Sequence, residues 1–167
     1  MEYAFIVDIT KCVGCYACEV ACKQEHNISS GPGWIRVFPA KTGSNGEQPH
    51  AGYTVTHCVH CSRPLCIAVC PTEAITKRED GIVMIHEELC IGCKECIAVC
   101  PLGAMLFDEI AAVARKCTLC VDRLDKGLKP ACAAACPSHC IYCGDVNSIT
   151  EQLGQQKLFT WYKATGA

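Results

Sequence analysis

The chain lacks the features that most directly point to an enzymatic or membrane role. It has no apolar stretch of about 18 residues and therefore no predicted transmembrane helix. It contains neither a Gly-x-Gly-x-x-Gly motif after a predicted strand nor a Gly-x4-Gly-Lys-Ser/Thr motif, which argues against a dinucleotide site and a phosphate-binding loop. No pairing of a nucleophile with a base is apparent. The sequence therefore gives no indication of a substrate site.

Basic residues are neither numerous nor concentrated. The sequence holds 15 Lys and Arg against 17 Asp and Glu, without a basic patch or stripe, so nucleic acid is not an expected partner. Residues 1–8 lack the basic start, long apolar core and small-residue cleavage site of a secretory signal. We therefore expect a cytoplasmic protein, in a compartment where clustered cysteines bind metal and do not form disulfides.

Cysteine, by contrast, is abundant, with 18 residues in 167. Sixteen of them form four groups of similar spacing: Cys12, Cys15, Cys18 and Cys22; Cys58, Cys61, Cys66 and Cys70; Cys90, Cys93, Cys96 and Cys100; and Cys117, Cys120, Cys132 and Cys136. The first and third groups read C-x2-C-x2-C-x3-C, and a proline follows the last cysteine of every group but the first. This is the spacing of bacterial ferredoxins. It predicts four [4Fe-4S] clusters and a role in electron transfer.

Structural zinc is the main alternative, and it would make the chain a zinc-binding interaction module. Zinc usually takes four ligands from two separated C-x2-C pairs. Triplets of the form C-x2-C-x2-C place three thiolates close together and fit that arrangement poorly. The spacing therefore favours iron–sulfur clusters.

An internal repeat suggests how the groups are paired. Residues 66–71, Cys-Ile-Ala-Val-Cys-Pro, recur as residues 96–101. Between the two copies, residues 74–77 and 82–85 are short β-rich runs around an Asp-Gly turn, which predicts a hairpin. Residues 58–107 are therefore expected to form one module with two clusters.

Groups one and four are then left to pair with each other. Residues 3–8 and 140–143 are predicted strands that could close a second module from the two ends of the chain. The predicted fold is α+β: two nested bacterial 2[4Fe-4S] ferredoxin-like modules with short strands, short helices and long loops. The outer module comprises residues 1–57 with 108–146, and residues 58–107 are inserted into it.

Two segments are not part of the cysteine groups. In the connection 23–57, residues 34–38 and 53–56 are predicted strands that cover the clusters. Residues 147–167 are expected to form a C-terminal helix and tail, with a capping box from Ser148 to Glu151 and a helix end near Lys157. The aromatic residues at 159–162 either pack on the chain's own surface or dock a partner.

Ligand sets follow from the nested pairing. Three cysteines of a group can hold three irons of one cubane, and in two-cluster ferredoxins the last cysteine of each group binds the other cluster. The predicted sets are Cys12, Cys15, Cys18 and Cys136; Cys117, Cys120, Cys132 and Cys22; Cys58, Cys61, Cys66 and Cys100; and Cys90, Cys93, Cys96 and Cys70.

Several residues beside the groups are candidates for supporting roles. Cys140 and Cys143 either bind metal as a C-x2-C pair or pack as small apolar residues beside a cluster. His57 and His60 either ligate metal or donate hydrogen bonds to cluster sulfur. The net charge of −2 becomes about −10 if each of four clusters with its thiolates carries −2. We expect basic residues within or beside the groups to offset part of that charge: Arg63, Lys94, Arg115 and Lys116.

These motifs resemble the four-cluster iron–sulfur subunits of the dimethyl sulfoxide reductase and formate dehydrogenase type. The resemblance covers about residues 3–146. Its most specific parts are the four groups in order, residues 115–120 (Arg-Lys-Cys-Thr-Leu-Cys) and residues 127–132 (Gly-Leu-Lys-Pro-Ala-Cys). Residues 8–15, Asp-Ile-Thr-Lys-Cys-Val-Gly-Cys, are similar to the family's opening.

The resemblance implies a non-catalytic electron-transfer subunit. Its implied partner is a larger catalytic subunit with a molybdenum or tungsten bis-pterin cofactor, as in aldehyde oxidoreductases or aromatic acyl-CoA reductases, together with a further redox subunit or a soluble ferredoxin. The chain is short for the family, which favours a soluble complex without a membrane span of its own. Similar short chains serve hydrogenases and carbon monoxide dehydrogenases, and a free polyferredoxin is a further alternative.

Metal analysis distinguishes the two cysteine chemistries. The anaerobically purified chain should be brown and contain about sixteen irons and sixteen acid-labile sulfides, because four cubanes each hold four of both. A colourless protein with zinc and no sulfide would contradict the iron–sulfur assignment.

Overall fold

Four short antiparallel strand pairs form the framework of the chain. The computed structural model describes residues 3–29, 31–40 and 52–153. Within these ranges, β1 (Tyr3–Val7) pairs with β8 (Ile141–Asp145), β2 (Ile35–Pro39) with β3 (Tyr53–His57), β4 (Ile75–Lys77) with β5 (Val83–Ile85), and β6 (Leu106–Asp108) with β7 (Val113–Arg115). Segments rich in Val, Ile and Thr account for most of the strands.

The helices are short because prolines and cysteine loops interrupt them. They are α1 (Ala17–Glu25), α2 (Leu65–Ala68), α3 (Glu95–Ala98), α4 (Val121–Leu124), α5 (Ala131–Ala134) and α6 (Val146–Leu153), with a 3₁₀ turn at Glu87–Leu89. Pro64 and Pro130 immediately precede α2 and α5. Each of these helices ends before a Cys-Pro pair, since the residue before proline disfavours helical geometry.

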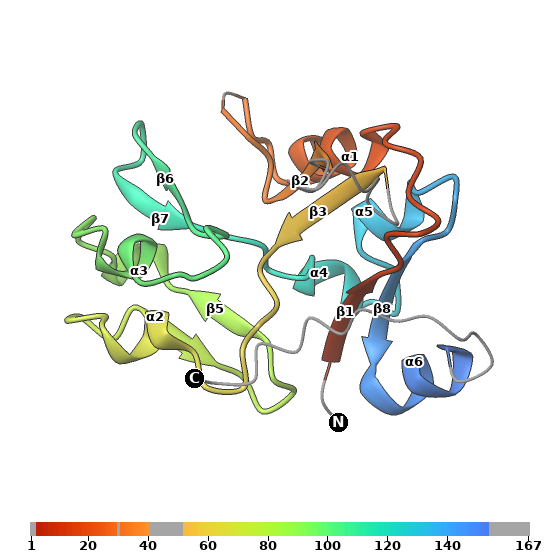
Figure 1. The fold of residues 1–167 in the computed structure, drawn as a ribbon. Coiled ribbons are helices and arrows are strands. Elements are labelled where there is room, and N and C mark those ends of the chain that lie inside the picture. Colours follow the sequence, from red (N-terminus) through yellow and green to blue (C-terminus); the bar gives the residue numbers. More distant parts are fainter. Residues whose placement is uncertain (1–2, 30, 41–51, 154–167) are drawn as a thin grey trace, which may run out of the picture.

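Segments from the two ends of the chain lie side by side. Tyr3 in β1 is opposite Asp145 in β8, and Val7 is opposite Ile141. The helices pair in a similar manner, since α1 packs on α5 and α2 packs on α3. Figure 1 shows β1 and β8 together on one side of the molecule, with α2, α3 and β5 on the other.

Cysteine side chains occupy much of the core. One cluster of buried residues contains Phe5, Ile35 and Leu119 together with cysteines of groups one and four. The second contains Ile75, Val83 and Met105 and includes cysteines of groups two and three. Each core therefore combines apolar side chains with the cysteines of two groups.

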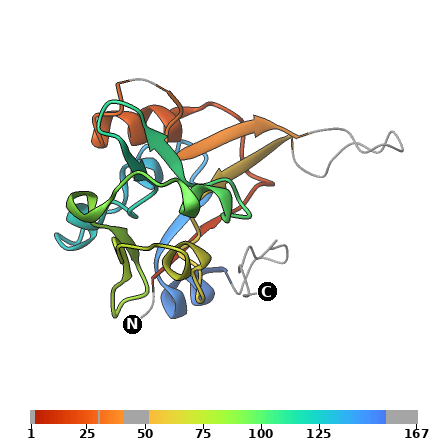
Figure 2. The same cartoon turned by 90° about the vertical axis from the view of Figure 1, so that its left-hand side faces the viewer.

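Most strand predictions are confirmed, with shifts of one or two residues. The predicted strands at 3–8, 34–38, 53–56, 74–77 and 82–85 correspond to β1, β2, β3, β4 and β5. The strand predicted at 140–143 begins one residue later and continues through Asp145, because its residues pair along the full length of β1. Figure 2 shows β2 and β3 as a ribbon that extends away from the rest of the fold.

The start of the last helix differs from the prediction. The helix begins at Val146, and the carboxylate of Asp145 accepts a hydrogen bond from the Ser148 backbone N–H at 3.2 Å. Asp145 is therefore the cap, and the predicted capping box at Ser148 is wrong. The predicted helix end near Lys157 and the aromatic residues at 159–162 lie outside the described residues.

The hairpin of β6 and β7 was not predicted. It crosses the expected boundary between residues 107 and 108, and Arg115 in β7 forms ion pairs with Asp108 at 2.6 Å and Glu87 at 2.8 Å. The hairpin therefore joins residues on both sides of that boundary. Separately, none of the helices in the described ranges has the length and apolarity needed to cross a membrane.

The β2–β3 ribbon should contribute to the stability of the fold. Ile35 at the start of β2 is 2% exposed in the first core, whereas Ile110 is 87% exposed. Ile35→Ala should cost about 3 kcal/mol because it leaves a cavity. Ile110→Ala should change stability by less than about 0.5 kcal/mol. Anaerobic thermal unfolding measures both, and equal melting temperatures for the two variants would contradict the packing described here.

Candidate metal centres

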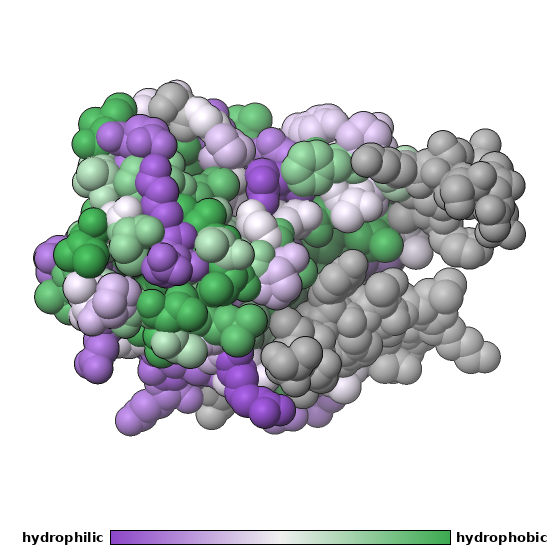
Figure 3. All heavy atoms as spheres, turned by 60° about the vertical axis from the view of Figure 1, so that its left-hand side comes forward, coloured by the Kyte–Doolittle hydropathy of each residue, from purple (hydrophilic) through white to green (hydrophobic). Residues whose placement is uncertain are grey.

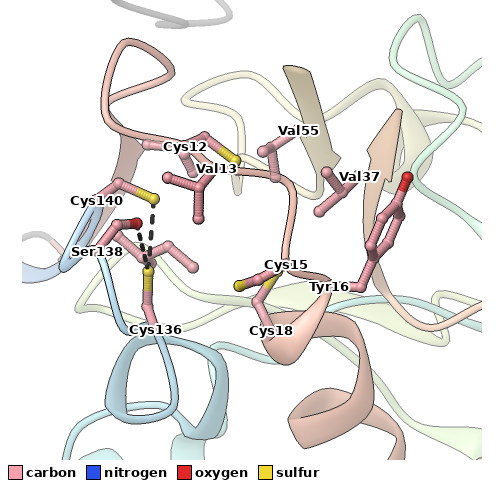
Figure 4. Close-up of a pocket in the computed structure, with 12 residues that line it drawn as sticks. Cys12, Val13, Cys15, Tyr16, Cys18, Val37, Val55, Cys136, Ser138 and Cys140 are labelled. Atoms are coloured by element: carbon pink, nitrogen blue, oxygen red, sulfur yellow. Dashed lines mark hydrogen bonds between the residues drawn. The ribbon is translucent and has the colours of Figure 1, made fainter. Parts of the chain in front are cut away.

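The first site joins group one to the end of group four. Cys12, Cys15, Cys18 and Cys136 line one cavity, and Figure 4 shows their side chains around it. Cys18 lies on α1, and Cys136 follows α5. Burial raises the pKa of Cys18 to about 12, and the nearby Cys12 and Cys136 act in the same direction. The structure therefore brings together the four cysteines of this predicted set.

The second site comprises Cys117, Cys120, Cys132 and Cys22. Burial raises the pKa of Cys132, and the proximity of Cys117, Cys120 and Cys22 raises it further. Cys22 lies one helical turn after Cys18 on α1, and Cys132 lies on α5. The irregular gap of eleven residues before Cys132 is spanned by α4 and a loop, which return the chain to this site.

The third site comprises Cys58, Cys61, Cys66 and Cys100. Burial raises the pKa of Cys61, with smaller contributions from the nearby Cys58 and Cys100. Burial likewise raises the pKa of Cys66 to about 11, and Cys58 and Cys61 add to the shift. The last cysteine of group three thus lies near Cys61 of group two, which in turn lies near Cys58 and Cys66.

The fourth site comprises Cys90, Cys93, Cys96 and Cys70. All four line a second cavity. Burial raises the pKa of Cys96 to about 11, and Cys90, Cys93 and Cys70 contribute in that order. Cys93 is exposed, as Cys15 is at the first site.

The spacing within the four sites suits a cubane better than a single metal ion. Zn–S bonds of about 2.3 Å would place ligand sulfurs within about 4 Å of one another. Among the described residues, no three or more Cys, His, Asp or Glu side chains converge closely enough to hold one ion. A cubane distributes its ligands over four irons and needs a wider arrangement. The cysteines of each site can therefore serve a [4Fe-4S] cluster without converging on one point.

Hydroxyl groups support two of the exchanged ligands. The Ser138 hydroxyl lies 3.5 Å from the Cys136 sulfur, and the Thr72 hydroxyl lies 3.7 Å from the Cys70 sulfur. Burial acts in the opposite direction, but these hydroxyls and nearby backbone N–H groups lower the pKa of both thiols. In both loops the sequence is Cys-Pro followed by Ser or Thr, so the same local turn holds each thiolate.

His26 is a further candidate that sequence reasoning missed. Its Nε2 lies 3.3 Å from the Cys120 sulfur, and its ring packs against Trp34 with centroids 4.2 Å apart. Burial lowers the pKa of His26, which favours the neutral ring. With its proton on Nε2, the ring donates a hydrogen bond to the thiolate. The sequence could have indicated this contact, because His26 follows Cys22 by four residues. Residues separated by about one helical turn lie on the same face of a helix.

The two histidines beside group two have different environments. His57 Nδ1 bonds to the Cys58 carbonyl at 2.9 Å, and burial lowers the pKa of His57 to about 4. His60 Nδ1 accepts a hydrogen bond from the Val83 backbone N–H at 3.0 Å, which places the proton on Nε2. That Nε2 is buried and has no partner among the described atoms. A cluster sulfur at the third site would satisfy it.

Cys140 and Cys143 lie at different sites. Cys140 is 3% exposed in the core, and its sulfur is 3.5 Å from the Cys136 sulfur (Figure 4). Burial raises the pKa of Cys143 to about 12, with a smaller contribution from Cys120 at the second site. The two residues therefore do not form a metal-binding pair with each other.

Of the basic residues expected to offset cluster charge, only one is buried. Arg63 is exposed, and Lys94 pairs with Glu109 at 3.5 Å while lying over the Phe107 ring. The Arg115 guanidinium forms ion pairs with Glu87 and Asp108. Lys116 is 2% exposed.

Two family models match the chain, and both are described as 4Fe-4S dicluster domains. One covers residues 50–146 and the other residues 11–74. The chain belongs to this iron–sulfur family. The two models together account for four [4Fe-4S] clusters, in agreement with the four cysteine groups. Their matches overlap at residues 50–74 and do not follow the nested division.

Curated relatives identify the branch of the family. The chain is 35% identical to one of the chains of anaerobic dimethyl sulfoxide reductase from Escherichia coli, over 92% of this chain and 78% of the relative. It is 34% identical to a putative dimethyl sulfoxide reductase iron-sulfur subunit from Halobacterium salinarum, over 87% and 67%. It is 36% identical to a subunit of tetrathionate reductase from Salmonella typhimurium, over 87% and 58%. The predicted resemblance is confirmed, and the chain is an electron-transfer protein without a catalytic role.

A pair of glycine variants tests the geometry of the fourth site. Gly92, between Cys90 and Cys93, and Gly127, beyond α4, both have a positive φ, of 68° and 71°. A Cβ at Gly92 would lie 2.6 Å from the Ala112 carbonyl oxygen, whereas a Cβ at Gly127 would meet no atom within 4 Å. Both alanine variants should therefore lose about 1–2 kcal/mol through the backbone conformation.

Only Gly92→Ala should also lose a cluster, because the clash displaces the loop that carries Cys90 and Cys93. Iron per chain and the anaerobic melting temperature distinguish the variants. Equal iron contents would show that the carbonyl contact does not shape the site.

Proposed function

We propose that this chain is the electron-transfer subunit of an oxidoreductase complex whose catalytic subunit carries a molybdenum or tungsten bis-pterin cofactor. The relatives support the assignment, since they are named as component chains or subunits of dimethyl sulfoxide and tetrathionate reductases. Each cluster, when bound, would accept one electron and pass it to its neighbour. The protein's contribution is to hold the four ligand sets in a row and to control their surroundings.

The main observation that supports this proposal is that helices with predicted ligand cysteines pack against each other in two similar pairs. Cys18 and Cys22 lie on α1, which packs on α5 with Cys132. In the same way, α2 with Cys66 packs on α3 with Cys96. The strand pairs β1–β8 and β4–β5 follow the same division, and so do the cysteines of the two cores. These features support two nested modules that exchange their fourth ligands.

The proposed row runs from the first site to the fourth. The first and second sites share α1, and the third and fourth sites share the exchanged Cys70 and Cys100. Between the pairs, Cys58 of the third site lies close enough to Cys117 of the second to raise its pKa, after the larger effect of burial. We propose that the inserted module extends through Arg115, because the β6–β7 hairpin belongs to it.

The ends of the row are suited to contact other proteins. Val13 at the first site and Ile91 at the fourth are 62% and 66% exposed, and each lies between the first two cysteines of its group. On the face that includes the inserted module, Figure 3 shows hydrophobic surface interrupted by hydrophilic side chains. We propose that one end meets the catalytic subunit and the other a further redox subunit or a soluble ferredoxin.

We also propose the class of the partner enzyme and the location of the complex. Molybdenum- or tungsten-dependent enzymes, for example of the aldehyde oxidoreductase or aromatic acyl-CoA reductase type, are the proposed partners, with hydrogenase, carbon monoxide dehydrogenase and free polyferredoxin as alternatives. A cytoplasmic location is proposed because sixteen cysteines are grouped for cluster binding, and a reducing compartment keeps such thiols available for metal. Purification of the native complex, with metal analysis of the bound large subunit, distinguishes these partners. A monomeric chain fully loaded with clusters would contradict a subunit role.

Double cysteine variants test the exchange of ligands. If Cys15 and Cys136 hold the same cluster, then Cys15→Ala, Cys136→Ala and the double variant should each affect one [4Fe-4S] cluster and leave three. If Cys120 and Cys136 hold different clusters, their double variant should leave only two. Mössbauer spectroscopy counts the intact clusters in each protein.

Cys143→Ala serves as the control, because Cys143 lies beside the second site without belonging to any ligand set, and it should retain four clusters. The opposite pattern, with two clusters left in the Cys15/Cys136 double variant and three in the Cys120/Cys136 double variant, would rule out the exchange.

A further inference from the structure

Lys116 is a buried cation at the junction of the two modules. Lys116 is 2% exposed. Its Nζ donates a hydrogen bond to the Val83 carbonyl on β5 and another to the Cys117 carbonyl, the latter at 2.9 Å. One bond thus reaches the inserted module, and the other reaches the backbone of a ligand at the second site.

The described residues provide Lys116 with no carboxylate partner. Its neighbour Arg115 shows the usual alternative, since it forms ion pairs with Glu87 and Asp108. Burying an unpaired ammonium is costly, and buried charges are normally paired. Two carbonyl dipoles satisfy two of its three N–H groups. The compensating negative charge must come from something else at this junction.

Hydrogen bonds connect Lys116 to both sites. Its bond to the Cys117 carbonyl reaches the second site directly. Val83, whose carbonyl accepts its other bond, donates its own N–H to His60 at 3.0 Å, and His60 directly precedes Cys61 of the third site. Lys116 also faces His60, whose Nε2 is the buried atom without a partner. The ammonium therefore lies between the second and third sites.

We propose that Lys116 is a positioning residue for electron transfer, and that its charge raises the reduction potentials of the second and third clusters together. This inference rests on the ligand sets proposed above. A reduced cluster carries one more negative charge than an oxidised one, so a nearby buried cation stabilises the reduced form. Cluster potentials depend on local charge, burial and hydrogen bonds to sulfur. One buried cation between two clusters would keep both accessible to the electron as it crosses between modules.

The test compares neutral and charged replacements at position 116 in the full, cluster-loaded chain. Lys116→Met removes the charge while keeping an apolar stem of similar length, and Lys116→Arg keeps the charge. Redox titration followed by electron paramagnetic resonance gives the four midpoint potentials. Lys116→Met should make the reduction equilibrium of two clusters at least about tenfold less favourable, a shift of about 59 mV for a one-electron couple. Lys116→Arg should shift them by less.

Lys77→Met is the matched control. The Lys77 Nζ also donates to backbone carbonyls beside the third site, those of Cys61 at 3.3 Å and Ser62 at 3.2 Å, but the side chain is exposed. Because solvent screens an exposed charge, its removal should change any reduction equilibrium by less than about threefold. Wild-type potentials in a fully loaded Lys116→Met protein would overturn the inference.

A second neutral variant keeps the test decisive if Lys116→Met loses its clusters. If Lys116→Met does not bind its four clusters, Lys116→Gln replaces it, because glutamine retains hydrogen-bond donors without the charge. The same shift in the reduction equilibrium of two clusters is expected for Lys116→Gln. If neither neutral variant loads, normal iron content in Lys116→Arg alone supports a requirement for charge. Failure of all three replacements would assign Lys116 a packing role and overturn the inference. The iron content of the wild-type chain, four clusters or fewer, tests the proposed function separately.

Discussion

Convergence of cysteines from distant segments is the constraint on which the rest of this structure depends. Each proposed ligand set takes three thiols from one segment and a fourth from another, so the segments must be held together before or as a cluster binds. Burial raises the pKa of several of these thiols, including Cys18, Cys66 and Cys96. Buried thiolates are therefore unfavourable without metal. Cluster binding stabilises them and should contribute much of the folding free energy, as in other metallo-domains.

The four sites combine buried and accessible cysteines. Cys18, Cys22, Cys132 and Cys136 lie within the first core, whereas Cys15 and Cys93 are exposed. Of the four basic residues expected to offset cluster charge, only Lys116 is buried, and it donates hydrogen bonds to the carbonyls of Val83 and Cys117. In the proposed row, partners would approach through the exposed cysteines, while the chain's own groups surround the buried ones.

Much of this arrangement could be predicted from the sequence because ligand spacing is a specific signal. The four groups, the central hairpin and the pairing of the two ends follow from cysteine positions and short apolar runs. Other features depend on tertiary contacts that spacing does not encode. The contact of His26 with Cys120, the ion pairs of Arg115 and the burial of Lys116 without a carboxylate partner each involve residues that are far apart in the sequence. The cap at Asp145 was missed because Asp145 and Ser148, three positions apart, are both residue types that can cap a helix.

The central claim is that Cys22 and Cys136 exchange between the clusters of groups one and four. Anaerobic crystals of the cluster-loaded protein, with anomalous diffraction at the iron edge, would locate the irons and the sulfurs bound to them. The account predicts four cubanes in a row, with Cys136 bound to the cluster of Cys12, Cys15 and Cys18, and Cys22 bound to the cluster of Cys117, Cys120 and Cys132. A map in which Cys22 binds the same cluster as Cys12 would contradict it.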